Sequence, residues 1–156
     1  MINFTPNWRA LAAGFCGSAA HSGLMFLKSH FDFLPSFHPY EDLQRTLSEL
    51  VGSSVHPWVP WALSLLNGSI VLGFIFGRTY QLLPGGSGAA KGFVFGLLGW
   101  LVMGLLFFPI LGRGAFATQV GLGFLPAVFS LLMVLSYSIV MGMAYSTMNR
   151  KSVAER

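Results

Sequence analysis

His21 is the ionisable side chain whose position first suggests chemistry, because it lies well inside a long uncharged stretch. That stretch runs from Ala10 to Leu27 and also holds Cys16. An imidazole at membrane depth is a candidate functional group that could ligate haem or a metal ion, or relay a proton. The competing interpretation is a neutral histidine bonded to a nearby serine or carbonyl. We favour the neutral histidine, because a six-coordinate haem needs a second axial ligand and no other expected span contains histidine.

Three further histidines share the polar segment that follows this stretch. They are His30, His38 and His56, and Glu41 and Asp42 lie among them. Imidazole and carboxylate groups are suitable zinc ligands, but these spacings match no zinc signature and no cysteine lies nearby in the sequence. His38 and His56 are therefore only weak metal candidates. We expect the protein to carry neither a metal ion nor another cofactor.

The sequence contains none of the common catalytic motifs: no Walker loop, GxSxG, HExxH or CxxC. No carboxylate falls within an expected span, so an ion-coupled transporter would lack its usual acidic carrier. We predict that the protein is not an enzyme. The polar groups expected at membrane depth should bond across helices or to the preceding turn. They are Ser64, Asn67, Ser130, Ser136 and Ser138.

Four uncharged stretches are long enough to cross a bilayer, which takes about 20 residues as a helix. The predicted spans cover residues 10–27, 58–77, 92–112 and 124–148, and residues 28–57 form an external loop. Only 9% of the residues are charged, whereas soluble domains have about a quarter. We therefore predict an all-α membrane protein with a single transmembrane domain of four helices. A cleaved signal peptide is the alternative for the first span, which we expect to be retained.

The distribution of basic residues predicts the orientation. Six Lys and Arg residues fall on one side of the expected bundle and three on the other. The positive-inside rule then places both termini in the cytoplasm. The basic residues occur singly near span ends, so the net charge of +4 indicates lipid headgroups rather than nucleic acid. The richer side holds Arg9, Arg78, Lys91, Arg150, Lys151 and Arg156, and the poorer side Lys28, Arg45 and Arg113.

The external loop contains a predicted short helix. Pro39 suits its first position, Glu41 and Asp42 place negative charge in the first turn, and Gly52 is a natural stop. Its leucines recur on one face, so we expect the helix to lie on the outer membrane surface with that face down. Contact with a partner subunit is the alternative. The later connection, residues 113–124, is expected to be an interfacial or re-entrant piece.

An internal repeat links the second and fourth spans. SIVLGFIF at residues 69–76 matches SIVMGMAY at residues 138–145, and Gly14-Phe15 matches Gly92-Phe93 more weakly. Two helical hairpins of one orientation would give this pattern, and chance similarity between apolar helices is the alternative. Small residues four apart form stripes that we expect at helix-packing seams, or else at contacts between copies. The predicted packing residues are Gly14, Ser18, Gly73, Gly77, Gly88, Gly92 and Gly96.

Two segments carry a resemblance to a known family. They are GFCGSAAHSGLMFLK, followed by a Leu-Pro loop, and GFVFGLLGWLVMGLLFFPILGRGAF, whose most distinctive positions are Pro109, Gly112, Gly114 and Phe116. The chain resembles, over nearly its whole length, small bacterial four-span membrane proteins grouped as a domain of unknown function. Members carry a histidine in the fourth span before a Tyr-Gly stretch, where this chain has Tyr137 and Ser138, so no role tied to that histidine is expected. The resemblance implies a multi-pass protein of the bacterial cytoplasmic (inner) membrane, without an established activity.

These observations favour a non-catalytic membrane component: an accessory, assembly or structural protein. Its expected partners are the lipid bilayer and other membrane subunits or further copies of itself, and not nucleic acid. A small channel or transporter for a neutral or lipophilic solute is the alternative, motivated by the repeat. A continuous wet cavity lined by His21, Asn67 and the serines of the fourth span would favour the channel. A solid core would favour the non-catalytic component.

Overall fold

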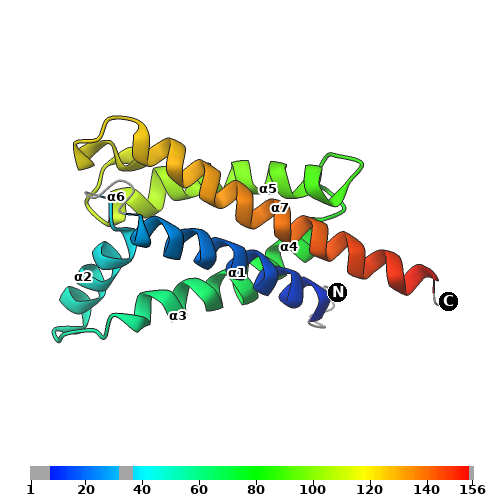
Figure 1. Ribbon diagram of the computed structural model, residues 1–156, viewed down its shortest axis with the longest axis horizontal. Helices are drawn as coiled ribbons and strands as arrows, with labels where there is room; N and C mark the ends of the chain where they lie inside the picture. The colour runs from blue at the N-terminus through cyan, green and yellow to red at the C-terminus, as the bar shows by residue number, and fades with distance from the viewer. Residues whose placement is uncertain (1–7, 32–36, 155–156) are drawn as a thin grey trace.

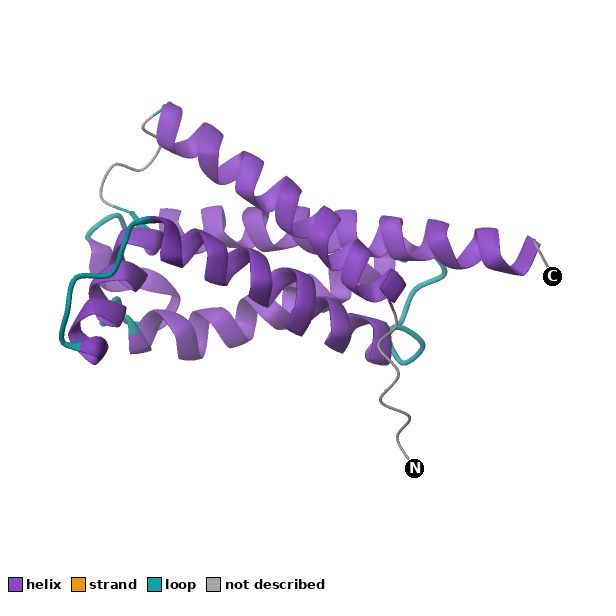
Figure 2. Cartoon of the chain, turned by 90° about the horizontal axis from the view of Figure 1, so that it is seen from below, coloured by secondary structure: helices purple, strands orange, loops and turns teal. Residues whose placement is uncertain are grey.

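Long helices make up nearly all of the protein. The computed structural model describes residues 8–31 and 37–154, in which every regular element is a helix (Figures 1 and 2). The all-α prediction is therefore confirmed for the described residues. The first and fourth long segments are α1 (Trp8–His30) and α7 (Leu125–Ala154). The second is α3 (Trp58–Leu66), η1 (Asn67–Leu72) and α4 (Gly73–Thr79); the third is α5 (Gly88–Val102), η2 (Met103–Phe107) and α6 (Phe108–Ile110).

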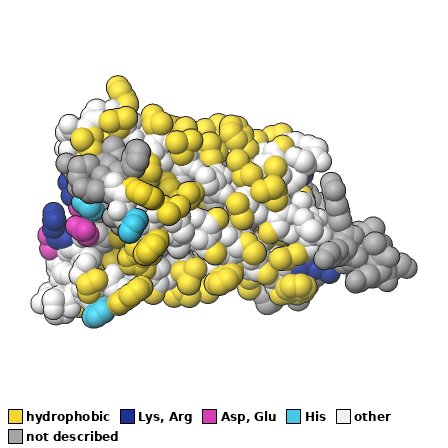
Figure 3. All heavy atoms as spheres, viewed as in Figure 1, with side chains coloured by type: hydrophobic (Ala, Val, Ile, Leu, Met, Phe, Trp, Pro, Cys, Tyr) yellow, Lys and Arg dark blue, Asp and Glu magenta, His cyan; other side chains and the backbone are white. Residues whose placement is uncertain are grey.

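All four long segments are long and apolar enough to cross a membrane. The qualifying stretches are Trp8–Lys28, Trp58–Thr79, Gly88–Ile110 and Leu125–Asn149, with mean hydropathies of 1.4, 1.8, 2.3 and 2.0. Figure 3 shows apolar side chains over the middle of the visible face, with charged and histidine side chains gathered at one end and basic side chains visible at the other. The start of α1, the end of α7 and the α4–α5 connection lie at the same end, here called the inner end (Figure 1). The opposite end is called the outer end.

Helices α1 and α7 form the centre of the bundle. Helix α1 packs against η1 and α4 on one side and against α7 on the other, and α7 packs against α5. The second and third segments meet near their short connection, where the Phe76 and Phe95 rings lie 5.1 Å apart. There Lys91 Nζ also donates a hydrogen bond to the Tyr80 carbonyl oxygen at 2.6 Å.

Small residues let the two helices of the first hairpin approach closely. A Cβ built on Gly73 would lie 2.7 Å from the Ala10 carbonyl oxygen, and one on Gly14 would lie 2.7 Å from the Ser69 carbonyl oxygen. Any larger side chain at these positions would collide with backbone. The glycines thus set the distance between α1 and the second segment, as expected where helices pack in lipid.

The second hairpin repeats these contacts at the positions that the sequence repeat aligns. Gly142 corresponds to Gly73, and a Cβ there would collide with the carbonyl oxygen of Gly88, which corresponds to Ala10. Gly92 corresponds to Gly14, and a Cβ there would collide with the carbonyl oxygen of Ser138. Matching contacts at matching positions are not expected from chance similarity. The repeat therefore describes two hairpins built in the same way.

A π-helical turn in the second segment brings two glycines onto one face. Gly68 and Gly73 are five residues apart, which in an α-helix would place them about 140° apart. In η1 the Gly73 amide donates to the Gly68 carbonyl oxygen, the wider i→i+5 pattern. Both glycines consequently face α1 or α7, where Gly68 meets Ser18 and Tyr137.

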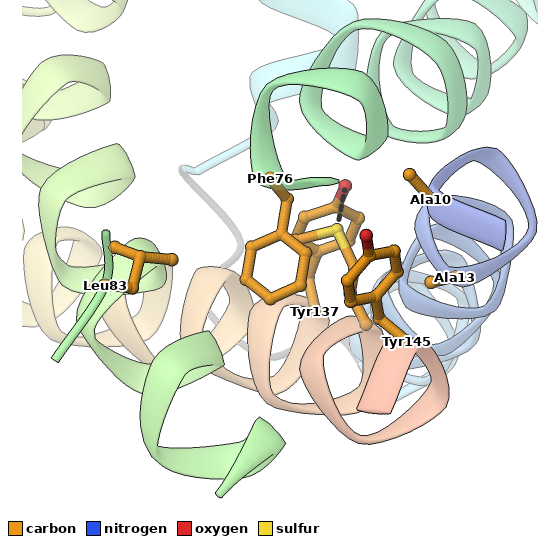
Figure 4. Packing of buried hydrophobic residues seen from close by; sticks show 7 residues of the cluster. Ala10, Ala13, Phe76, Leu83, Tyr137 and Tyr145 are labelled. Carbon is orange, nitrogen blue, oxygen red and sulfur yellow. Dashed lines mark hydrogen bonds between the residues drawn. The ribbon is translucent and has the colours of Figure 1, made fainter. Parts of the chain in front are cut away.

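Large side chains fill the inner half of the bundle. Phe76, Tyr137 and Tyr145 are buried together with Met141, and the Phe76 and Tyr145 rings lie 5.8 Å apart edge to face (Figure 4). Phe76 and Tyr145 are the last aligned positions of the two repeats. Equivalent residues of the two hairpins therefore meet each other in the core.

The predicted external helix is present as α2 (Pro39–Val51). Pro39 begins it, and Gly52 ends it in the left-handed conformation (φ +72°) with its amide bonded to the Ser48 carbonyl oxygen. It crosses the outer end of the bundle (Figure 1) and packs against α3. Leu50 and Val51 remain exposed at its end.

Candidate functional site

Polar groups at membrane depth meet where α1, η1 and α7 come together. The Tyr137 hydroxyl donates to the Gly68 carbonyl oxygen at 2.6 Å and lies 3.4 Å from Met141 Sδ (Figure 4). The hydroxyls of Ser18 and Ser69 are buried here and have no hydrogen-bond partner. We call these groups, from Ser18, Gly68, Ser69 and Tyr137, the polar seam. Closely packed helices surround it, so it holds helices together and presents no open site.

His21 lies on α1 close to this seam. Its ring is half-buried and faces the backbone carbonyl of Met133 on α7. This is the arrangement expected for a histidine that bonds to a neighbouring helix. The free thiol of Cys16 is also half-buried in α1.

An ion pair with a buried carboxylate and a partly exposed guanidinium fastens α2 to the end of the third segment. Asp42 is only 5% exposed, and Arg113 Nε donates to its Oδ2 at 2.8 Å while Arg113 Nη2 donates to Oδ1. The hydrogen bonds that Arg113 donates to Asp42 raise the pKa of its guanidinium, which stays charged. Close by, buried Lys28 donates from Nζ to the Phe37 carbonyl oxygen at 2.6 Å. We call Lys28, Phe37, Asp42 and Arg113 the outer clasp.

The connection between α6 and α7 folds back against the bundle. Its 3₁₀ turn, η3 (Ala115–Val120), holds Phe116 and Ala117 at φ of +53° and +58°, where residues with a side chain are rare. The Phe116 ring packs over Gly104 and lies 4.7 Å from the Trp100 ring. Trp100 Nε1 in turn donates to the Ala127 carbonyl oxygen at 3.1 Å. The connection is thus wedged between the third and fourth segments through one aromatic ring.

The two histidines proposed as weak metal ligands have different partners. His38 Nδ1 lies 3.5 Å from Glu41 Oε1 on the first turn of α2. His56 Nδ1 accepts a hydrogen bond from the Trp58 amide at 3.3 Å. Among the described residues, no three metal-binding side chains come together.

Two shallow grooves open on the outer half of the bundle. One has a volume of about 410 Å³ between α1 and α7, and the other about 390 Å³ beside the start of α3. Both linings are chiefly apolar, and neither includes His21 or Asn67. The first is lined by Leu24, Leu27, Lys28, Phe31, Phe129, Leu132, Met133 and Ser136, and the second by Phe26, Pro57, Trp58 and Trp61.

The predicted packing residues all lie where helices meet. Gly77 faces Ala10, Gly96 faces Ser138, and Ser18 meets Gly68. These contacts serve packing within one chain.

Of the five polar residues expected at membrane depth in the second and fourth spans, Asn67 is the one whose side chain is exposed on the surface of the bundle. It makes no hydrogen bond within the part of the chain that the structure describes. By contrast, Ser64 accepts from the Tyr40 hydroxyl at 3.0 Å, and the Ser130 and Ser136 hydroxyls donate to carbonyls of their own helix. An amide without a partner in hydrocarbon costs about 4–8 kcal/mol. Its expected bond across helices is absent among the residues that the structure describes, because η1 turns Gly68 and not Asn67 towards α1.

Sequence reasoning missed two features of the sites: the outer clasp and the wedge formed by Phe116. Asp42 and Arg113 lie 71 residues apart, and only the fold brings them together. The glycines on either side of Arg113 were the sequence signal for a sharp turn at this residue. Gly112 and Gly114 both have positive φ and turn the chain back.

Comparison with known proteins identifies the family. The model of the family of unknown function DUF6789 matches residues 4–155. Neither the curated proteins nor the solved structures gave a match. Since the match covers almost the entire chain, which folds into four helices of membrane-spanning length, the protein belongs to DUF6789, a family of unknown function.

Proposed function

We propose that this protein is a non-catalytic component of the bacterial inner membrane, acting as an accessory, assembly or structural subunit with both termini in the cytoplasm. The observation that carries the proposal is how its internal polar groups are used. Tyr137, Trp100 and Ser130 bond to backbone or to each other across packed helices, and the outer clasp fixes α2 to the bundle. These polar side chains hold the chain's own helices in place.

The surfaces left over are suited to contact with neighbours in the membrane. Leu50 is 78% exposed and Val51 67% exposed on α2, and Trp58 at the start of α3 is 72% exposed. Exposed apolar residues at the outer end are suited to docking against another membrane subunit or the lipid interface.

Purification of the full-length protein in mild detergent, after crosslinking in the host, tests this proposal. We place a photo-crosslinking residue at Val51 and, as a matched control, at exposed Glu49 on the same helix. The expected result is one defined membrane protein crosslinked at Val51 and little at Glu49. Crosslinks to lipid alone from every position would contradict a subunit role.

A conduit for a small neutral solute is a second candidate, motivated by the repeat; such a path would require the closed polar seam, with its buried hydroxyls of Ser18 and Ser69, to open. Liposomes that contain the purified protein would then take up glycerol or urea faster than empty liposomes. Ser18→Ala and Ser69→Ala together would change that rate. Uptake equal to that of empty liposomes rejects the conduit and leaves the subunit role standing.

A further inference from the structure

Asn67 sits close to the midplane of the membrane on the lipid-facing side of the second segment. It lies nine residues after Trp58 and twelve before Thr79, which places it about 13 Å and about 18 Å from the two ends of the stretch. In a hydrocarbon core about 30 Å thick, no water reaches this depth. Among the described residues its amide has no partner, so a polar group from outside the chain would be needed to satisfy it.

The residues around Asn67 form a continuous unpartnered face. Leu63, Leu66, Ile70 and Val71 lie within four residues of Asn67 and are 42%, 52%, 52% and 48% exposed. The second segment lies along the edge of the bundle, so this face is open to a neighbour (Figure 1). We call Leu63, Leu66, Asn67, Ile70 and Val71 the Asn67 face.

We propose that a second copy of this chain docks on the Asn67 face, about a two-fold axis normal to the membrane. An amide carries both donors and an acceptor, so two Asn67 side chains can satisfy each other. A two-fold axis normal to the membrane places both Asn67 side chains at the same depth. An unrelated partner would have to carry a polar group of its own at that depth. Isologous pairing of one patch with itself is also the commonest arrangement of homo-oligomers.

The internal repeat supplies an independent contrast. Asn67 aligns with Ser136 in the repeat. Asn67 lies two residues before SIVLGFIF, and Ser136 lies two residues before SIVMGMAY. The Ser136 hydroxyl donates to the Leu132 carbonyl oxygen of its own helix at 2.8 Å and so needs no external partner. The inference goes beyond the proposed function and does not depend on it, since either a subunit or a conduit can form dimers.

The proposal is tested by measuring how the full-length protein associates in phosphatidylcholine vesicles. Single-molecule photobleaching reports the association over a range of protein-to-lipid ratios. The wild-type protein should form dimers, and Asn67→Leu should lower the association constant about tenfold. Asn67→Gln keeps the amide and should retain most of the association. Ser136→Leu, the repeat-matched control, should leave it unchanged.

Disulfide crosslinking locates the interface in the same vesicles. In a Cys16→Ser background, Leu63→Cys and Ile70→Cys should give crosslinked dimers several-fold more efficiently than Leu98→Cys and Leu101→Cys, which are exposed on α5. A monomeric wild-type protein would overturn the proposal. So would equal association of the wild-type and Asn67→Leu proteins, or equal crosslinking from both helices. Monomeric behaviour of Asn67→Leu with an unchanged melting temperature separates lost docking from lost folding.

Discussion

Asp42 and Arg113 form an ion pair that fixes the position of α2 at the outer end. The carboxylate is buried, and both guanidinium contacts reach it from a connection 71 residues away. A buried pair adds little stability over an apolar replacement, but losing one partner leaves the other charge without compensation. The pair therefore fixes where α2 lies more than it adds to overall stability.

Arg113→Met should lower the free energy of unfolding by about 3 kcal/mol, because the Asp42 carboxylate stays buried without a partner. The double variant Asp42→Leu/Arg113→Met should be less destabilised than Arg113→Met alone. Thermal unfolding in detergent measures both. Exposed Arg45 on α2 provides the control, and Arg45→Met should change stability by less than about 0.5 kcal/mol. Equal melting temperatures for Arg113→Met and Arg45→Met would show that the clasp does not hold α2.

At the scale of elements, the helices and their packing faces were predictable, and the interruptions of the helices were not. Uncharged length is a local property of the sequence and predicted the four long helices; Pro39, the acidic first turn and Gly52 are equally local and predicted α2. The π turns of η1 and η2 arise from packing between segments, because Gly68 and Gly104 must face Tyr137 and Phe116. No local pattern encodes that requirement, so the outward position of Asn67 was also missed.

Gly92→Ala should destabilise the bundle, because the added methyl collides with the Ser138 carbonyl oxygen at the α5–α7 seam. We expect a loss of about 1–3 kcal/mol, as for overpacked cores. Gly99→Ala is the control on the same helix, since its Cβ would meet only Val134 Cγ1 at 3.9 Å. Higher helix propensity should leave Gly99→Ala as stable as the wild-type protein or more so. Equal melting temperatures for the two alanine variants would argue against close packing at Gly92.

Phe116→Ala should loosen the connection between α6 and α7, because the ring fills the space over Gly104 and against Trp100. The side chain is half-buried, so we expect a loss of about 2–3 kcal/mol, below the cost for a fully buried phenylalanine. Phe124→Ala in the same connection removes a ring that is 76% exposed and should have little effect. Hydrogen exchange of residues 111–124 measures the loosening directly. Unchanged protection in Phe116→Ala would mean that the ring does not hold the connection.

For the whole molecule, the structure places the beginning of α1, the α4–α5 connection and the end of α7 at one end (Figure 1). Arg9, Arg78 and Lys91 belong to that end, while Lys28, Arg45 and Arg113 belong to the other. The grouping of basic residues used for the orientation thus agrees with the fold. Which end faces the cytoplasm remains a prediction of the positive-inside rule.

Cysteine labelling in intact cells tests that orientation. In a Cys16→Ser background, Ser53→Cys lies after α2 and Gly86→Cys lies in the α4–α5 connection, and both positions are exposed. A membrane-impermeant maleimide should label Ser53→Cys in intact cells and Gly86→Cys only after the membrane is opened. The reverse pattern would place the termini outside.

The matching glycine contacts of the two hairpins have an evolutionary consequence. Duplication and fusion of a shorter gene whose product paired with itself would produce two equivalent halves, and would turn that pairing into a contact within one polypeptide. Phe76 and Tyr145, whose rings lie 5.8 Å apart, would then mark where the two products met. The two halves are not symmetric throughout, since the close contact of α1 with α7 has no equally close counterpart between the second and third segments.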